Sequence, residues 1–430
     1  MRPNQIPVGF ARHYRSPRFR LRNAMKRRVL LATAGMMPFA AFAAEWDKQP
    51  EIRQTDAVVA ADIRSGPHFA LGPTVTTLAY LNRYAVNTDY GPFIAPSDVR
   101  LRRLIREIAA IAQLQAMQQT EAFEKAAVEA GKSPFRSAKN LIDDPVGTLS
   151  AIPEGIGSFF NRASEQLHRE GRSRYEDGPA KQILAVSGYK REYAAKLGVD
   201  AYSSNEALQK ELDRLAWASA AGNLTLGALS FVTGALVLQV ASNVRLLEQA
   251  QNLVAATPPS ELSKRNREQL RRMAVPDPVI DRFLRNTSLS PRHETIIVAS
   301  MAALGAIPGR SRFIEYATGA DTEDSALLFQ QIAELMASYS TVVSPVRGIS
   351  VEFNLPIVTT TKGLNVVLLP IDRLLWTARN AEIARGLAGT RPAVSELWIT
   401  GDASPKAAAG LKDAGLALTQ YCGKQLPLLD

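Results

Sequence analysis

Residues 97–112 read SDVRLRRLIREIAAIA and contain the clearest structural signal in the chain. Their apolar side chains recur at intervals of three or four residues, which places them on one face of an α-helix; they are Leu101, Leu104, Ile105, Ile108, Ile111 and Ala112. Ser97 stands where an N-cap is needed, because its hydroxyl can accept a backbone N–H of the first turn. We therefore predict an amphipathic helix that begins after Ser97 and packs against a core.

The helical period continues through most of the chain up to about residue 345. Ser290 and Pro291 are typical of an N-cap and of the first residue of a helix. A further apolar stripe ends before Pro345, since proline cannot continue a helix; it consists of Leu328, Ile332, Leu335 and Tyr339. Residues 44–74 lack clear periodicity. We therefore expect a loosely ordered N-terminal segment at 44–96, followed by a helical domain at 97–345.

From about residue 348 the period changes to the two-residue alternation of strands. Strands are predicted at residues 349–353, 357–361, 366–369, 394–399 and 416–419. Ser404 caps a short helix that ends at Gly415, so the last unit is β-α-β. We predict a small α+β module at 346–430, and a fold class that is mainly α with a helical N-terminal and central region.

Residues 1–43 have the features of a secretory signal peptide. They hold nine basic and no acidic residues, and the apolar stretch Val29–Phe42 leads to a small-residue site. We expect cleavage after Ala43, so that Ala44 begins the exported protein. The apolar stretch is shorter than the roughly 20 residues that a bilayer-spanning helix needs.

The leader also carries the basic charge of the chain. The sequence has 51 Lys and Arg against 41 Asp and Glu, a net charge of +10. Without residues 1–43 the basic count falls to 42 and the net charge to +1, so nucleic-acid binding loses its main support. Three alternatives stay open: translation from Met25 instead of Met1, twin-arginine export through Arg27 and Arg28, and a buried helix in place of the leader.

One cysteine and four histidines limit the chemistry of the chain. Cys422 cannot form an internal disulfide, and one cysteine excludes a four-thiolate zinc site and a cysteine-ligated iron–sulfur cluster. We interpret His68, His168 and His293 as surface or capping residues. The acidic residues in 321–324 suit the positive end of a helix better than a calcium ion. The sequence therefore predicts no metal and no cofactor.

Residues 215–244 carry no charged side chain. As a helix, residues 224–242 would extend roughly 28 Å, which is enough to cross the hydrocarbon core of a bilayer. A helix buried on all sides within a helical core has the same composition. We favour the buried helix, and membrane insertion through 215–244 is the alternative.

A second amphipathic helix is predicted at residues 144–160. Its apolar face includes Ile156, Phe159 and Phe160, and two adjacent phenylalanines suit a membrane interface. The first turns hold no lysine or arginine that would attract anionic lipids, so we expect a helix docked on the core. Ile156, Phe159 and Phe160 form the candidate interaction surface.

Two short motifs are typical of the serine acyl-enzymes of the bacterial envelope, in which a lysine helps to deprotonate the serine. Ser187 and Lys190 match S-x-x-K, and Ser203 and Asn205 match S-x-N. The motifs lie too close together for that family, and no K-T-G triad follows. Residues 203–206 also fit a capping box before an amphipathic helix. The sequence therefore assigns no catalytic residue.

Two further stretches are distinctive as a pair. One combines Asp144-Pro145-Val146-Gly147-Thr148 with residues 152–157, and the other runs from Lys190-Arg191 through Leu197-Gly198-Val199-Asp200-Ala201-Tyr202-Ser203-Ser204-Asn205. Together they resemble a set of uncharacterised exported bacterial proteins. The resemblance implies an exported bacterial setting, and it implies no activity and no catalytic residue.

We expect an exported envelope or secreted protein that binds an unknown protein partner or a membrane surface and is not an enzyme. No Ser/His/Asp, metal or phosphate-binding pattern is visible, although a site can be assembled from residues distant in sequence. The alternatives are a periplasmic hydrolase with such a site and a protein inserted in the membrane through 215–244. A deep pocket that gathers His293 or His168 with carboxylates would favour the hydrolase, and a shallow apolar groove near Phe159 and Phe160 would favour binding.

Overall fold

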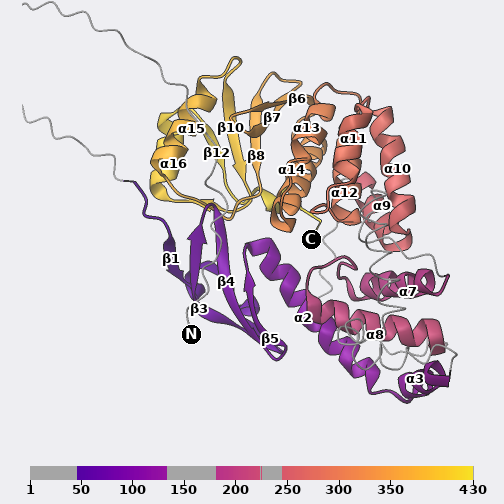
Figure 1. Cartoon of the computed structure of the whole chain (residues 1–430). Helices are drawn as coiled ribbons and strands as arrows, with labels where there is room; N and C mark the ends of the chain where they lie inside the picture. Colours follow the sequence, from indigo (N-terminus) through magenta and orange to yellow (C-terminus); the bar gives the residue numbers. More distant parts are fainter. Residues whose placement is uncertain (1–45, 133–180, 223, 225–244, 430) are drawn as a thin grey trace, which may run out of the picture. The chain divides into compact units, whose positions relative to one another are not determined.

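The computed structural model describes residues 46–132, 181–222, 224 and 245–429 (Figure 1). Strands dominate its N-terminal and C-terminal regions, and helices lie between them in the sequence. The protein is therefore an α/β protein, and the mainly α fold class predicted from the sequence is wrong.

The N-terminal sheet is antiparallel. Its strands are β1 (Glu51–Gln54), β2 (Ser65–Gly66), β3 (Phe69–Leu78), β4 (Leu81–Thr88) and β5 (Gly91–Ala95). The order is β1-β3-β4-β5, with β2 beside β3, and the short helix α1 (Thr55–Val58) follows β1. This sheet replaces the loosely ordered segment that we predicted for residues 44–96.

Two local features explain why this sheet was not predicted from the sequence. The turn between β3 and β4 consists of Ala79 and Tyr80, both with positive φ (48° and 78°), whereas two-residue hairpins of this kind usually contain Asn-Gly. Thr77 and Asn82 face each other next to the turn and are buried although polar. Their side chains satisfy each other, because Thr77 Oγ1 donates to Asn82 Oδ1 at 2.8 Å. The turn therefore lacks its usual Asn-Gly sequence, and strands β3 and β4 lack the usual alternation of apolar and polar residues.

The central region is helical, as predicted. Its helices are α2 (Asp98–Gln118), α3 (Glu121–Lys132), α7 (Lys181–Leu197), α8 (Glu206–Gly222), α9 (Arg245–Ala256), α10 (Pro259–Arg272), α11 (Asp277–Leu284), α12 (Pro291–Ala303), α13 (Arg310–Ala317) and α14 (Glu323–Val342). Ser97 and Ser290 cap α2 and α12, and both predicted caps are confirmed. The first half of α2 packs on the N-terminal sheet, and its second half packs against α3, α7 and α8.

Among the residues that the structure describes, no helix is long and apolar enough to cross a membrane. Of the uncharged stretch 215–244, residues 215–222 form the end of α8, and Leu224 is buried. Several sequence predictions lie outside the described residues: the rest of that stretch, the leader with Ala43 and Ala44, and the candidate surface of Ile156, Phe159 and Phe160.

The C-terminal sheet is mixed and has the order β12-β10-β8-β7-β6. Its strands are β6 (Val346–Glu352), β7 (Leu355–Thr360), β8 (Asn365–Leu369), β10 (Val394–Ile399) and β12 (Ala417–Thr419). Strands β8, β10 and β12 are parallel to one another, and β6 and β7 are antiparallel to their neighbours. The predicted strands of this region are confirmed, as is the cap Ser404.

Helices cover both faces of the C-terminal sheet. Helix α14 packs on one face, and α15 (Ala378–Ala388) and α16 (Pro405–Asp413) pack on the other (Figure 1). The apolar core on the α14 side also contains residues of α10 to α13, so it continues across residue 345. Beyond the carboxyl ends of β8 and β10, the short strands β9 (Arg373–Leu374) and β11 (Asp402–Ala403) pair with each other.

The N-terminal sheet is attached to these carboxyl ends through Asp372. Asp372 Oδ2 accepts the backbone N–H of Asn82 at 2.9 Å and that of Asp98, the first residue of α2, at 3.1 Å. The carbonyl of Tyr80 accepts the N–H groups of Asp372 and Arg373 at 3.0 and 3.1 Å. These contacts hold the β3–β4 turn in its positive-φ conformation and fix the start of α2.

Gly401 is required for the approach of the loop that carries Asp372. A Cβ at residue 401 would lie 2.0 Å from the carbonyl oxygen of Asp372. We expect Gly401→Ala to lower the free energy of unfolding by about 1–3 kcal/mol, as overpacking of a tight site does. Gly188→Ala is the matched control, because a Cβ at that position of α7 meets nothing within 4 Å and alanine favours a helix by about 0.5–1 kcal/mol. Denaturant unfolding checks both, and equal effects of the two variants would contradict the close approach.

Candidate functional site

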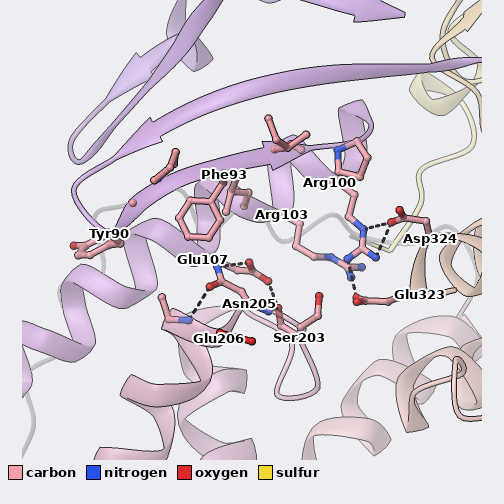
Figure 2. Close-up of a pocket in the computed structure, with 18 of the residues that line it drawn as sticks. Tyr90, Phe93, Arg100, Arg103, Glu107, Ser203, Asn205, Glu206, Glu323 and Asp324 are labelled. Carbon is pink, nitrogen blue, oxygen red and sulfur yellow. Dashed lines mark hydrogen bonds and ion pairs between the residues drawn. The ribbon is translucent and has the colours of Figure 1, made fainter. Parts of the chain in front are cut away.

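A cavity of about 700 Å³ lies beside α2 (Figure 2). Four segments far apart in sequence line it: residues 90–96 around β5, one side of α2 between Arg100 and Glu107, residues 203–207 at the start of α8, and residues 322–324 at the start of α14. Its volume is in the range of about 300–1,000 Å³ that is typical of small-molecule sites.

Arg103 is the buried cation of the cavity. Its side chain is 5% exposed, and its Nη2 has no hydrogen-bond partner among the described residues. Burial lowers the pKa of the guanidinium, and Arg292 and Arg100 lower it further, yet an arginine keeps its charge in proteins. A buried charged donor without a partner is costly, so an anionic group in the cavity would satisfy Arg103.

Arg100, one turn earlier on α2, is already neutralised. Its Nη1 lies 2.7 Å from Glu323 Oε1, and its Nη2 lies 3.0 Å from Asp324 Oδ1. Burial opposes ionisation of Glu323, but Arg100 lowers the pKa of this carboxyl below its usual value. Two of the acidic residues that the sequence placed at a helix start therefore bind an arginine of α2 (Figure 2).

Glu107 is a buried carboxylate on the same side of α2. It is 4% exposed, its Oε1 accepts the hydroxyl of Ser203 at 2.6 Å, and its Oε2 accepts the amide Nδ2 of Asn205 at 2.9 Å. Burial raises the pKa of Glu107. Both of these donors are neutral. The hydrogen bond from Asn205 fixes the orientation of the Glu107 carboxylate, and the Ser203 hydroxyl lies beside that carboxylate (Figure 2).

The loop before α8 positions these two donors. Asn205 Oδ1 accepts the backbone N–H groups of Ala207 at 3.1 Å and of Leu208 at 3.3 Å, and Ser203 Oγ accepts that of Asn205 at 3.1 Å. Asn205 is therefore the N-cap of α8, and the predicted capping box at 203–206 is wrong, because the helix begins at Glu206. The side chain of Ser203 points to Glu107 instead.

The two residues of the S-x-x-K motif, Ser187 and Lys190, lie outside the cavity. Lys190 forms an ion pair with Asp213, with 2.6 Å between Nζ and Oδ1, and neither Ser187 nor Lys190 is among the residues that line the cavity. A lysine held in this way cannot act as the base for Ser203.

The described histidines do not form a catalytic site. His293 is 1% exposed, and its Nδ1 accepts the backbone N–H of Ser290 at 3.2 Å, so it is a capping residue. Burial lowers its pKa well below the usual value, and it is not among the residues that line the cavity. His68 is exposed beside Asp89, and His168 lies outside the described residues.

Two further predictions concern metals and the cysteine. Within the described ranges, no group of three or more His, Cys, Asp or Glu side chains could hold a metal ion. Cys422 is buried, as expected, and burial raises the pKa of its thiol to about 12. A thiol with this pKa is protonated at neutral pH and is a poor nucleophile.

A second cavity, of about 430 Å³, lies on the opposite side of α2 and is lined by Asp98, Arg102, Arg106, Asp372 and Asp402 among others. Burial and the neighbouring Asp98 raise the pKa of Asp372 well above its usual value. Asp372 accepts two backbone N–H groups, and Asp98 Oδ1 accepts from Asn82 Nδ2 at 2.9 Å and from the Tyr84 hydroxyl. These carboxyl groups hold the N-terminal sheet in place.

Comparison with protein-family models, with curated proteins and with solved structures gives no match for this chain. The candidate site is therefore defined by the geometry of its own residues.

Arg103 is expected to lower the stability of the unliganded protein. We predict that Arg103→Met raises the free energy of unfolding by about 1–3 kcal/mol, because the apolar stem remains and the unsatisfied buried donor is removed. Arg292→Met is the comparison: its Nε is also a buried donor without a hydrogen-bond partner among the described residues, but its Nη2 donates to the carbonyl of Leu429 at 3.1 Å and its Nε lies 3.8 Å from Asp200 Oδ2, so its loss lowers stability. Denaturant unfolding without added anions checks both, and a loss of stability in Arg103→Met would show that Arg103 is a structural residue.

Proposed function

We propose that this protein is an exported binding protein and that the cavity beside α2 takes a small anionic ligand, a carboxylate or a phosphate. The observation that carries the proposal is Arg103, a buried guanidinium that lines the cavity and whose Nη2 lacks a hydrogen-bond partner in the described part of the chain. Carboxylates and phosphates are the groups whose geometry an arginine fork matches.

Among the described residues, no carboxylate of the cavity forms an ion pair with Arg103, although Glu107, one turn later on α2, attracts its guanidinium and raises its pKa. Glu323 and Asp324 are held by Arg100, with contacts of 2.7 and 3.0 Å, so they do not neutralise Arg103 directly. Tyr90, Phe93 and Leu104 add apolar surface to the lining. An organic anion would thus place its charged group at Arg103 and its carbon skeleton on the apolar side chains.

Anions are expected to stabilise the folded chain through Arg103. We predict that millimolar acetate, butyrate or inorganic phosphate raises the melting temperature relative to chloride at equal ionic strength, since a ligand that binds only the folded state stabilises it. Arg103→Met should lose the shift. The exposed Arg312→Met should keep it, because Arg312 lies outside the cavity and is 66% exposed.

Scanning fluorimetry over a concentration series gives the apparent affinities, and the carboxylate and phosphate series separate the two kinds of anion. A shift that survives in Arg103→Met would contradict the proposal, as would the same shift with chloride.

Export is proposed on the sequence of residues 1–43, with its basic start, apolar stretch and small-residue site. The resemblance of residues 144–157 and 190–205 to exported bacterial proteins supports it. The partner surface at Ile156, Phe159 and Phe160 and the membrane alternative at 215–244 stay predictions of the sequence.

The exported protein is expected to begin at Ala44. N-terminal sequencing of the protein recovered from the periplasm or the medium of an expressing bacterium should give Ala44 as the first residue. Blocking cleavage with Ala43→Pro should retain the precursor, whose own N-terminus then distinguishes a start at Met1 from one at Met25. An uncleaved N-terminus on the functional protein in the cytosol would contradict export.

A further inference from the structure

The contacts of Ser203 and Glu107 match the arrangement of a nucleophile and its base. Ser203 Oγ donates to Glu107 Oε1 at 2.6 Å, and Glu107 is oriented in turn by Asn205 Nδ2 at 2.9 Å. A hydroxyl within hydrogen-bond reach of a base that a third group orients is the geometry of an activated nucleophile. The three side chains line the same cavity as Arg103 (Figure 2).

We infer that the cavity is a hydrolytic site for carboxylic esters, with Ser203 as the nucleophile, Glu107 as the general base and Arg103 as the donor to the oxyanion. The inference rests on the proposed function, because the carboxylate that we place on Arg103 is the acid product of such a reaction. The ester class follows from the chemistry: Arg103 would bind first the oxyanion of the intermediate and then the product carboxylate.

The protonation states suit this role. One lone pair of Ser203 Oγ accepts the backbone N–H of Asn205 at 3.1 Å, and a hydroxyl oxygen has a second one for attack. Burial raises the pKa of Glu107, and a base is most effective when its pKa approaches the working pH. Arg103 has the buried donor that an oxyanion site requires.

The reaction needs only water as co-reactant. Ser203 Oγ bonds to the ester carbon while its proton passes to Glu107, and the charge that develops on the carbonyl oxygen faces Arg103. Collapse of the intermediate breaks the bond to the alcohol oxygen, which takes the proton from Glu107. Water then attacks the acyl carbon and gives a proton to Glu107, and Ser203 leaves with that proton. The carboxylic acid is released and ionises.

The test is covalent labelling of the full chain with a fluorophosphonate, which reacts with activated serines, followed by tandem mass spectrometry. We expect one adduct, located on Ser203, and no adduct after denaturation. Glu107→Gln should slow labelling at least 100-fold, in line with the ~10²–10⁴ that a general base contributes. Ser187→Ala and Glu261→Gln are matched controls outside the cavity and should label at the wild-type rate.

Turnover is measured with p-nitrophenyl butyrate on the same variants. We expect Ser203→Ala and Glu107→Gln to lose at least 99% of the activity and Arg103→Met to lower kcat more than it raises KM. Location of the adduct in the wild-type chain decides the assignment even if Ser203→Ala does not fold.

An adduct elsewhere, no adduct, or unchanged labelling of Glu107→Gln would overturn the hydrolytic assignment. Anion-dependent stabilisation without labelling would leave the proposed binding function intact. Labelling without anion binding would contradict both roles of Arg103, as the anion-binding residue and as the donor to the oxyanion.

Discussion

The carboxyl group of Asp372 is the contact on which the arrangement of the site depends. Its Oδ2 accepts the N–H of Asn82 in β4 and that of Asp98 at the start of α2, so one side chain after β8 fixes the N-terminal sheet and α2 together. The contact requires Gly401, because any side chain there would overlap the Asp372 backbone. The direction in which α2 leaves this point determines where its later residues lie.

The polar side chains of helix α2 differ in whether they have hydrogen-bond or ion-pair partners, and this difference creates a binding site. Its apolar stripe packs on the N-terminal sheet and on α3, α7 and α8, while its polar residues line two cavities. Arg100 is matched by two acidic residues of α14, and the donors to Glu107 are two neutral side chains. The Nη2 of Arg103, which lies between them on α2, has no hydrogen-bond partner in the part of the chain that the structure describes. Of these three α2 residues, Arg103 is therefore the one to which a ligand contributes most.

Periodicity predicted the elements whose apolar residues recur regularly, such as α2, α14 and strand β10. It failed for the N-terminal sheet, because Thr77 and Asn82 are buried but polar and the turn at Ala79 and Tyr80 depends on contacts with residues about 290 positions later. The residues of the site could not be predicted from the sequence for a related reason. Arg103 and Glu107 look like the solvated face of a helix, since a sequence does not show that distant segments cover that face.

Asn205 explains why a capping role and a chemical role coincide at the start of α8. Its Oδ1 accepts two N–H groups of the helix, and its Nδ2 donates to Glu107. Helix formation thus fixes the amide, the amide fixes the carboxylate, and the carboxylate aligns the Ser203 hydroxyl before any ligand arrives. Such preorganisation is what makes polar groups effective in a buried site. A local structural reason for a polar residue therefore does not argue against its participation in chemistry.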